Sequence, residues 1–154
     1  MGNHDRRLLP GGERPNDEHA RQTVARLDEA DPAWAGWLRD RPMFLEVAGF
    51  TVVHAGLHPS GKLEATRESD FLTLRRWPDE KPSDPHWHEV YEGERRVVFG
   101  HDARRGGVRV LRRGQPWLIG LDTGCVYGKK LTGWIPEEDV YVTEPAARVY
   151  CPVG

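Results

Sequence analysis

The stretch Val98-Phe99-Gly100-His101-Asp102 decides the fold class, because a short apolar run ends there in small and polar residues. The same pattern occurs at Val53-His54-Ala55-Gly56 and at Gly120-Leu121-Asp122-Thr123-Gly124, and a related block, Gly2-Asn3-His4-Asp5, opens the chain. In a packed α/β domain, strands stop at such places and the following loops deliver side chains into a cleft, where ligand sites tend to form. We therefore predict an α/β fold with a site at its strand ends.

Three histidines recur in these blocks. His4, His54 and His101 lie too far apart in the sequence for any local structure to explain the pattern. Only a tertiary site would bring their imidazoles together. The sequence therefore predicts a tertiary site rather than a local structure.

Length and composition limit the classes of protein to which the chain can belong. A chain of 154 residues suits one domain over residues 1–154. With 22 basic and 24 acidic residues, its net charge of −2 predicts no specific binding to nucleic acid. Apolar runs such as Phe50–Val53 are too short to span a membrane. Cys125 and Cys151 do not make a disulfide framework, which predicts a cytoplasmic protein.

The first third of the chain is predicted to be helical. The pattern runs from Pro15 to Arg41, with a break at Asp31-Pro32 and with Asn16 or Asp17 as the cap. One kinked helix or two helices would both fit. An apolar stripe at spacings of three and four residues predicts one buried face, made of Val24, Leu27, Trp34, Trp37 and Leu38.

The rest of the chain is predicted to be mostly antiparallel sheet. Met43–Val47 and Phe50–His54 are close enough to form a hairpin. Ser69–Trp77 is a candidate helix, and Pro78–Trp87 is a proline-rich loop. Later strands are expected at 96–99, 108–111, 117–121, 131–135, 140–143 and 148–150.

Four blocks together resemble a known family. GNHD (2–5), VHAG (53–56), FGHD (99–102) and LDTGCVYGKKLTGW (121–134) are similar to the phosphoprotein-phosphatase branch of the calcineurin-like metallophosphoesterases. Bacterial serine/threonine phosphatases and diadenosine tetraphosphatase-like enzymes resemble the chain most. The resemblance extends from Gly2 to about Val142 and implies a sandwich of two mixed sheets flanked by helices, with a binuclear metal centre between the sheets.

The resemblance also implies residue roles. Asn3 would give an amide oxygen, and His54 and His101 imidazole nitrogens, to the second metal. His4 would be the general acid, since an imidazole titrates near working pH. Such mixed ligands suit a divalent ion, manganese first, with iron or zinc as alternatives. Arg75 resembles a phosphate-binding arginine, although a surface salt bridge explains it equally well.

Two motifs of the family have no counterpart in this chain. Asp-x-His and Gly-Asp-x-x-Asp-Arg-Gly precede the GNHD block in the family and supply the first metal's ligands and the bridging carboxylate. We therefore expect an N-terminally truncated domain, binuclear only if the missing part is supplied, that binds metal weakly and catalyses little. A start codon assigned too late is favoured over a true remnant. An exposed sheet edge and self-association are also expected.

Several other polar residues have simpler explanations. His58, His86 and His88 lie in loop sequence and are predicted to be solvated rather than metal ligands. Asp5 could contact and orient His4 or act as a helix or turn cap, with the cap slightly favoured, and Asp122 is taken as a turn residue. Paired arginines, among them Arg104-Arg105, could steer an anionic substrate, although scattered surface charge explains them more simply.

Three functions fit these observations. The first is a metal-dependent phosphoesterase acting on phosphoproteins or on dinucleoside polyphosphates as part of a longer chain. The alternative is a non-catalytic remnant that binds a phosphorylated ligand or a partner protein. The third is a mononuclear metal-binding protein without phosphatase ancestry.

Overall fold

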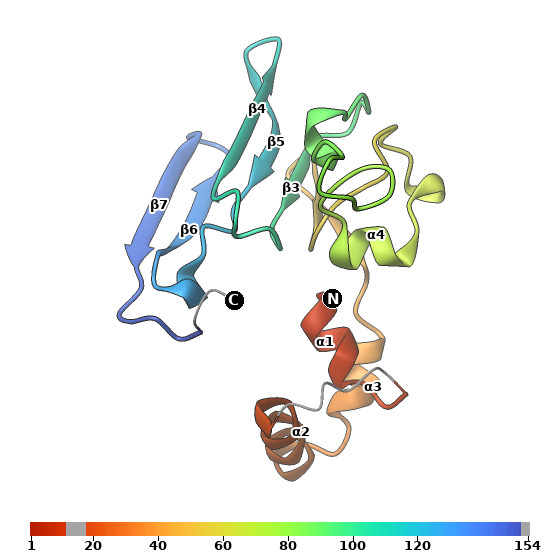
Figure 1. The fold of residues 1–154 in the computed structure, drawn as a ribbon, viewed down its shortest axis with the longest axis vertical. Helices are drawn as coiled ribbons and strands as arrows, with labels where there is room; N and C mark the ends of the chain where they lie inside the picture. Colours follow the sequence, from red (N-terminus) through yellow and green to blue (C-terminus); the bar gives the residue numbers. More distant parts are fainter. Residues whose placement is uncertain (12–17, 152–154) are drawn as a thin grey trace. The chain divides into compact units, whose positions relative to one another are not determined.

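The computed structural model of the protein describes residues 1–11 and 18–151. The chain divides into two compact units, Met1–Met43 and Phe44–Gly154. The helices are α1 (Asn3–Leu8), α2 (Glu18–Ala30), α3 (Trp34–Arg39) and α4 (Glu68–Thr73), with 3₁₀ helices η1 (Leu63–Ala65), η2 (Trp87–Glu89) and η3 (Cys125–Tyr127) (Figure 1). The strands are β1 (Phe44–Val47), β2 (Phe50–Val53), β3 (Val97–Phe99), β4 (Val108–Arg112), β5 (Gln115–Gly120), β6 (Lys130–Ile135) and β7 (Val140–Pro145).

The first unit is helical, as predicted, and the break falls at Asp31-Pro32. The Asp31 carboxylate accepts a hydrogen bond from the Ala33 N–H at 2.9 Å, which satisfies one of the free donors at the start of α3. Trp34 is buried, whereas Trp37 is 60% exposed, so the predicted apolar stripe is wrong at Trp37. The predicted caps Asn16 and Asp17 lie outside the described residues. No helix in residues 1–11 and 18–151 is long and apolar enough to cross a membrane.

The second unit is built on a five-stranded sheet in the order β1-β2-β3-β5-β4. The predicted hairpin is confirmed, because β1 pairs antiparallel with β2 and Phe44 lies opposite Val53. The expectation of a mostly antiparallel sheet is wrong at its centre, where β2, β3 and β5 are parallel. Residues 54–96 separate β2 from β3, and so long a connection allows the chain to return and pair in parallel.

Parallel pairing brings three strand ends to one edge of the sheet. The Gly100 N–H donates to the His54 carbonyl at 2.9 Å, and the Leu121 N–H donates to the Phe99 carbonyl at 2.8 Å. These bonds continue the ladder just beyond the strands. The polar residues that follow β2, β3 and β5 therefore start from neighbouring points.

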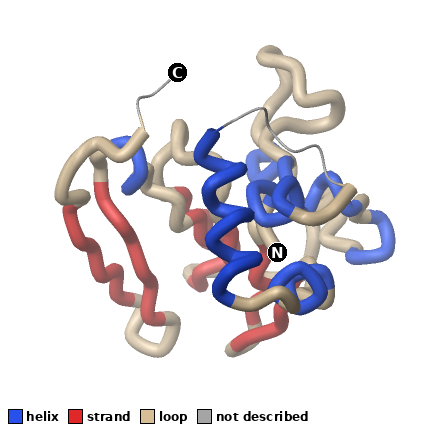
Figure 2. The backbone as a smooth tube through the Cα atoms, turned by 90° about the horizontal axis from the view of Figure 1, so that it is seen from below, coloured by secondary structure: helices blue, strands red, loops and turns tan. Residues whose placement is uncertain are grey.

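A second, smaller sheet consists of β6 and β7, which pair antiparallel (Figures 1 and 2). Trp134 of this sheet packs edge to face on Phe50 of β2, with ring centroids 5.0 Å apart. The opposite face exposes apolar side chains, Leu131 and Val142 among them. The α/β class is thus confirmed, with a mixed five-stranded sheet and a two-stranded antiparallel one. Residues 148–150 form no strand, which corrects the prediction; instead Tyr150 N–H donates to the Val126 carbonyl.

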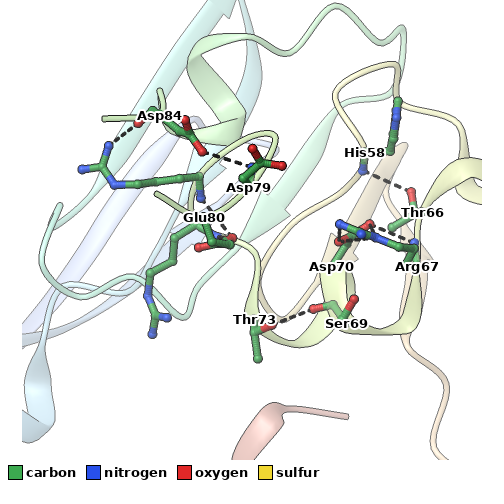
Figure 3. Close-up of polar contacts among 11 residues, drawn as sticks. His58, Thr66, Arg67, Ser69, Asp70, Thr73, Asp79, Glu80 and Asp84 are labelled. Carbon is green, nitrogen blue, oxygen red and sulfur yellow. Dashed lines mark hydrogen bonds and ion pairs between the residues drawn. The ribbon is translucent and has the colours of Figure 1, made fainter. Parts of the chain in front are cut away.

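The connection between β2 and β3 folds back against the sheet. Helix α4 ends at Thr73 rather than Trp77, because the Arg75 and Arg76 N–H groups donate to the Glu80 carboxylate at 2.6 and 3.1 Å instead of continuing the helix (Figure 3). The start of α4 is held by Asp70, which is 2% exposed and accepts from the Arg67 N–H at 2.9 Å.

His86 and His88 are buried, so the prediction that they are solvated loop residues is wrong. Each is 8% exposed, and Trp87 between them is 1% exposed. The Trp87 N–H donates to the Arg75 carbonyl, which pins this part of the loop to the residues after α4. Its indole packs edge to face on Phe99 of β3 with ring centroids 4.9 Å apart. Apolar packing of Trp87 therefore draws both histidines into the core.

Gly56 is required by this packing. A Cβ built at Gly56 would lie 2.8 Å from Trp87 Nε1, closer than side chains tolerate. We expect Gly56→Ala to lower the free energy of unfolding by about 1–3 kcal/mol through overpacking. Urea denaturation followed by fluorescence measures this. The control is Gly100→Ala, where a Cβ would meet the His54 carbonyl oxygen at an ordinary 3.5 Å. Equal losses in the two variants would refute the packing explanation.

Candidate metal centre

His54 and His101 meet at the edge of the sheet. His54 directly follows β2, and His101 follows β3 with Gly100 between them. His54 Nε2 lies 3.2 Å from His101 Nδ1, and the ring centroids are 4.9 Å apart at an interplanar angle of 58°. The structure thus brings together two of the predicted ligands, which are far apart in the sequence.

His101 sits in an unusual backbone conformation and a dry environment. Its φ is +69°, the left-handed region that non-glycine residues seldom adopt and that clusters at functional sites. Burial, with Arg75 and His54 nearby, lowers the pKa of His101 to about 4. The imidazole is therefore neutral near pH 7, and Nδ1 can offer a lone pair.

The other ring nitrogen of His101 is buried. Within the described residues, Nε2 makes no hydrogen bond of good geometry, although the neighbouring Thr73 backbone favours the protonated form. A metal-binding histidine commonly directs its second nitrogen at a backbone carbonyl or carboxylate, which fixes the ring. The position of Thr73 suits that role.

The two histidines fit a shared divalent cation. Nitrogens 3.2 Å apart, each about 2.0–2.1 Å from one ion, would subtend an angle of about 100°, between the octahedral and tetrahedral values. Neutral imidazoles suit zinc or iron, and manganese would be suited where oxygen ligands join them. No cluster of three or more histidine, cysteine, aspartate or glutamate side chains in the described part of the chain is arranged to hold a metal.

Asn3 and His4, the other two predicted site residues, lie in the first turn of α1. Asn3 is buried and His4 is exposed. The Asp5 carboxylate accepts from the Gly2 N–H at 2.9 Å, which confirms Asp5 as a cap. All belong to the unit Met1–Met43. Their roles as metal ligand and general acid stay predictions.

Arg75 lies beside the histidine pair. Its Nε is 3.9 Å from Asp102 Oδ1, and Asp102 Oδ2 is also 3.5 Å from His86 Nδ1. Arg75 and His101 line one cavity of about 260 Å³. The long, partly exposed ion pair with Asp102 leaves the guanidinium able to contact a ligand as well. Arg75 thus makes a surface ion pair and also lines the cavity that contains His101.

The loop after β5 closes another side of this cavity. Tyr127 and Lys129, which follow the Asp-Thr-Gly turn, contribute to its lining. The Asp122 carboxylate accepts from the Gly124 N–H at 3.1 Å, confirming its turn role. Thr123 Oγ1 donates to the Lys130 carbonyl at 2.6 Å and fixes the loop to β6. The sequence prediction missed Tyr127 and Lys129 as site residues, although both lie within the quoted motif.

Comparisons with known proteins show which proteins the chain is similar to. The chain is 33% identical to an asymmetrical bis(5'-nucleosyl)-tetraphosphatase of Bacillus subtilis (strain 168) over 105 residues, 64% of this chain and 41% of that protein. A symmetrical bis(5'-nucleosyl)-tetraphosphatase of Shewanella sp. (strain ANA-3) is 26% identical, covering 94% of this chain and 75% of the relative. The crystal structure of a candidate diadenosine tetraphosphatase matches with a TM-score of 0.68 at 29% identity. No family model matches the chain.

The chain is thus similar to bis(5'-nucleosyl)-tetraphosphatases and to a candidate diadenosine tetraphosphatase, which are calcineurin-like metallophosphoesterases. The chain spans 41% of the Bacillus subtilis relative. The structural match includes 94% of this chain and 66% of the chain in the solved structure. The similarity to these phosphatases argues against the third hypothesis, a metal-binding protein without phosphatase ancestry.

His88, buried near the site, gives the chain a pH-dependent stability. Burial, with His86 beside it, lowers the pKa of His88 from 6.5 to about 4. As the pH falls from 6.5 to 4 the unfolded chain takes up a proton that the folded chain does not, so stability is lost over this interval. We expect His88 to account for about 2 kcal/mol of the loss between pH 7 and pH 5.

The measurement is urea denaturation of the wild type and His88→Gln at both pH values. The variant should lose less stability between pH 7 and pH 5 than the wild type. His19→Gln, on the exposed surface of α2, controls for removal of an imidazole. An unchanged pH dependence in His88→Gln would contradict the prediction.

Proposed function

We propose that this chain carries the histidine ligands and phosphate-binding residues of a metal-dependent hydrolase of dinucleoside polyphosphates. The observation that carries the proposal is the approach of His54 Nε2 to His101 Nδ1 at 3.2 Å. Relatives named as bis(5'-nucleosyl)-tetraphosphatases support the substrate class. The chain spans only part of the length of those relatives, so hydrolysis by the chain itself is proposed.

His54 and His101 would hold one divalent ion, for which manganese is the proposed choice. When bound, such an ion lowers the pKa of water and draws charge from a phosphate oxygen. The chain's own residues position the substrate. Asn3 is proposed as a further ligand through its amide oxygen, and His4 as the group that protonates the leaving oxygen. Both assignments rest on the GNHD motif.

Arg75 is proposed to hold the phosphate under attack. Its guanidinium shares a cavity with His101 and offers paired N–H donors that match phosphate oxygens. Asp102, 3.9 Å away, would orient the guanidinium without neutralising it tightly. Phosphoryl transfer needs little covalent chemistry from the protein, so placing phosphate between Arg75 and the ion is the main requirement.

A dinucleotide is favoured over a phosphoprotein as substrate. The relatives compared above are named for hydrolysis of bis(5'-nucleosyl) tetraphosphates. The cavities beside His101 and Arg75 are lined by several further cations, which suits a ligand with more than one phosphate. Slow turnover is expected from this chain, because its proposed ligands are neutral and compensate the charge of the ion poorly.

The test combines calorimetry with chromatography of products. With Mn²⁺ present, diadenosine tetraphosphate should bind about ten-fold tighter than a phosphoserine peptide. Any hydrolysis should stop on chelation of the metal and in His101→Ala, but persist in the control His58→Ala. His58 packs on Trp77 with ring centroids 4.6 Å apart and is outside the proposed ligand set.

Three outcomes are decisive. Equal binding of the peptide, or hydrolysis that survives chelation and His101→Ala, would contradict the proposal. Metal-dependent binding of the dinucleotide without turnover would favour the alternative, a non-catalytic protein that binds a phosphorylated ligand.

A further inference from the structure

Five basic side chains gather around two cavities next to the histidine pair. We call them the basic rim: Arg75, Arg76, Arg104, Arg105 and Lys129. One cavity, of about 260 Å³, also contains His101, and the other, of about 500 Å³, also contains His86. Arg75, Asp102 and Arg104 line both, so the cavities adjoin one another. The rim thus extends outward from the proposed metal ligands.

Three cations of the basic rim are held by the protein. Arg105 pairs with Glu89 at 2.8 Å, and Arg75 lies 3.9 Å from Asp102. The guanidinium of Arg76 donates to the Asp84 carbonyl (Figure 3). These contacts fix the walls of the cavities.

Arg104 and Lys129 differ from the other three. Within residues 1–11 and 18–151, neither has an ion-pair or hydrogen-bond partner for its side-chain charge. Both are exposed, and both line the cavity that contains His101. The carboxylate of Asp102 in this cavity lies against Arg75 and His86, and among the described residues it forms no ion pair with Arg104 or Lys129. The charges of these two side chains are therefore left for an anion to neutralise.

The backbone holds both residues in short turns. The Arg105 N–H donates to the Asp102 carbonyl at 3.2 Å, and Ala103 is buried at 8% exposure, which anchors the turn bearing Arg104. The Lys129 N–H donates to the Gly124 carbonyl at 3.2 Å, and Gly124 has a φ of +76° that favours glycine. Neither cation therefore has to be ordered from a free loop on binding.

We propose that Arg104 and Lys129 form an outer phosphate subsite, which binds phosphates of a polyphosphate chain other than the one attacked. This inference rests on the proposed function and adds the residues that distinguish a polyphosphate from a single phosphate ester. The single phosphate of a monoester would contact Arg75 and neither of these two cations. Additional phosphates reach the two unneutralised cations, and charge-assisted hydrogen bonds there add affinity.

The experiment measures binding without metal or turnover. Orthophosphate and inorganic tripolyphosphate are each titrated by calorimetry into three proteins. These are the wild type, the double variant Arg104→Gln/Lys129→Gln and the control variant Arg113→Gln. Arg113 is exposed in the turn between β4 and β5 and lines neither cavity. The wild type should bind tripolyphosphate about ten-fold tighter than orthophosphate, and the double variant should lose most of that preference.

The result can fail independently of the proposed function. Equal affinity of the wild type for the two anions, or an equal loss in Arg113→Gln, would overturn the subsite. A loss of orthophosphate binding as large as that of tripolyphosphate would also overturn it, because the residues would then act on every anion. If the anion-binding result is not obtained but Mn²⁺-dependent hydrolysis is observed, only the subsite is refuted. If the anion-binding result is obtained with a chain that does not hydrolyse the dinucleotide, the subsite stands and the hydrolase function is refuted.

Discussion

The parallel alignment of β2 with β3 is the constraint on which the site depends. It sets Gly100 against His54 through a backbone hydrogen bond of 2.9 Å, so the histidines that follow the two strands start from adjoining points. The left-handed backbone of His101 then turns its imidazole toward His54, with 3.2 Å between the nitrogens. A slip of one residue in this register would send alternate side chains to the other face and separate the pair.

Much of this was accessible from the sequence because it is local. Pro32 lacks the N–H that would continue the preceding helix but suits the start of the next one, and two apolar runs separated by Ala48-Gly49 predict a hairpin. His54 and His101 could be selected because each follows an apolar run and precedes or follows a small residue. The sequence pattern thus identified the ends of β2 and β3 and the two side chains that meet there.

The remaining features depend on contacts between distant residues. Parallel pairing of β2, β3 and β5 follows from how residues 54–96 return to the sheet, which no short pattern records. His86 and His88 were expected in solvent, but Trp87 between them is a core residue and takes them inside. Lys129 lines the cavity only because the loop after β5 folds toward His101. The role of Asn3 as a ligand beside the histidine pair stays a prediction from the GNHD motif.

The central claim is that His54 and His101 bind the same cation. Electron spin echo envelope modulation of the Mn²⁺-loaded protein tests it most directly, because directly bound imidazole nitrogens couple to the electron spin and can be counted. The 3.2 Å approach predicts two bound imidazoles, falling to one when either histidine is replaced by alanine. A count that neither replacement changes, or a spectrum without imidazole coupling, would contradict the account.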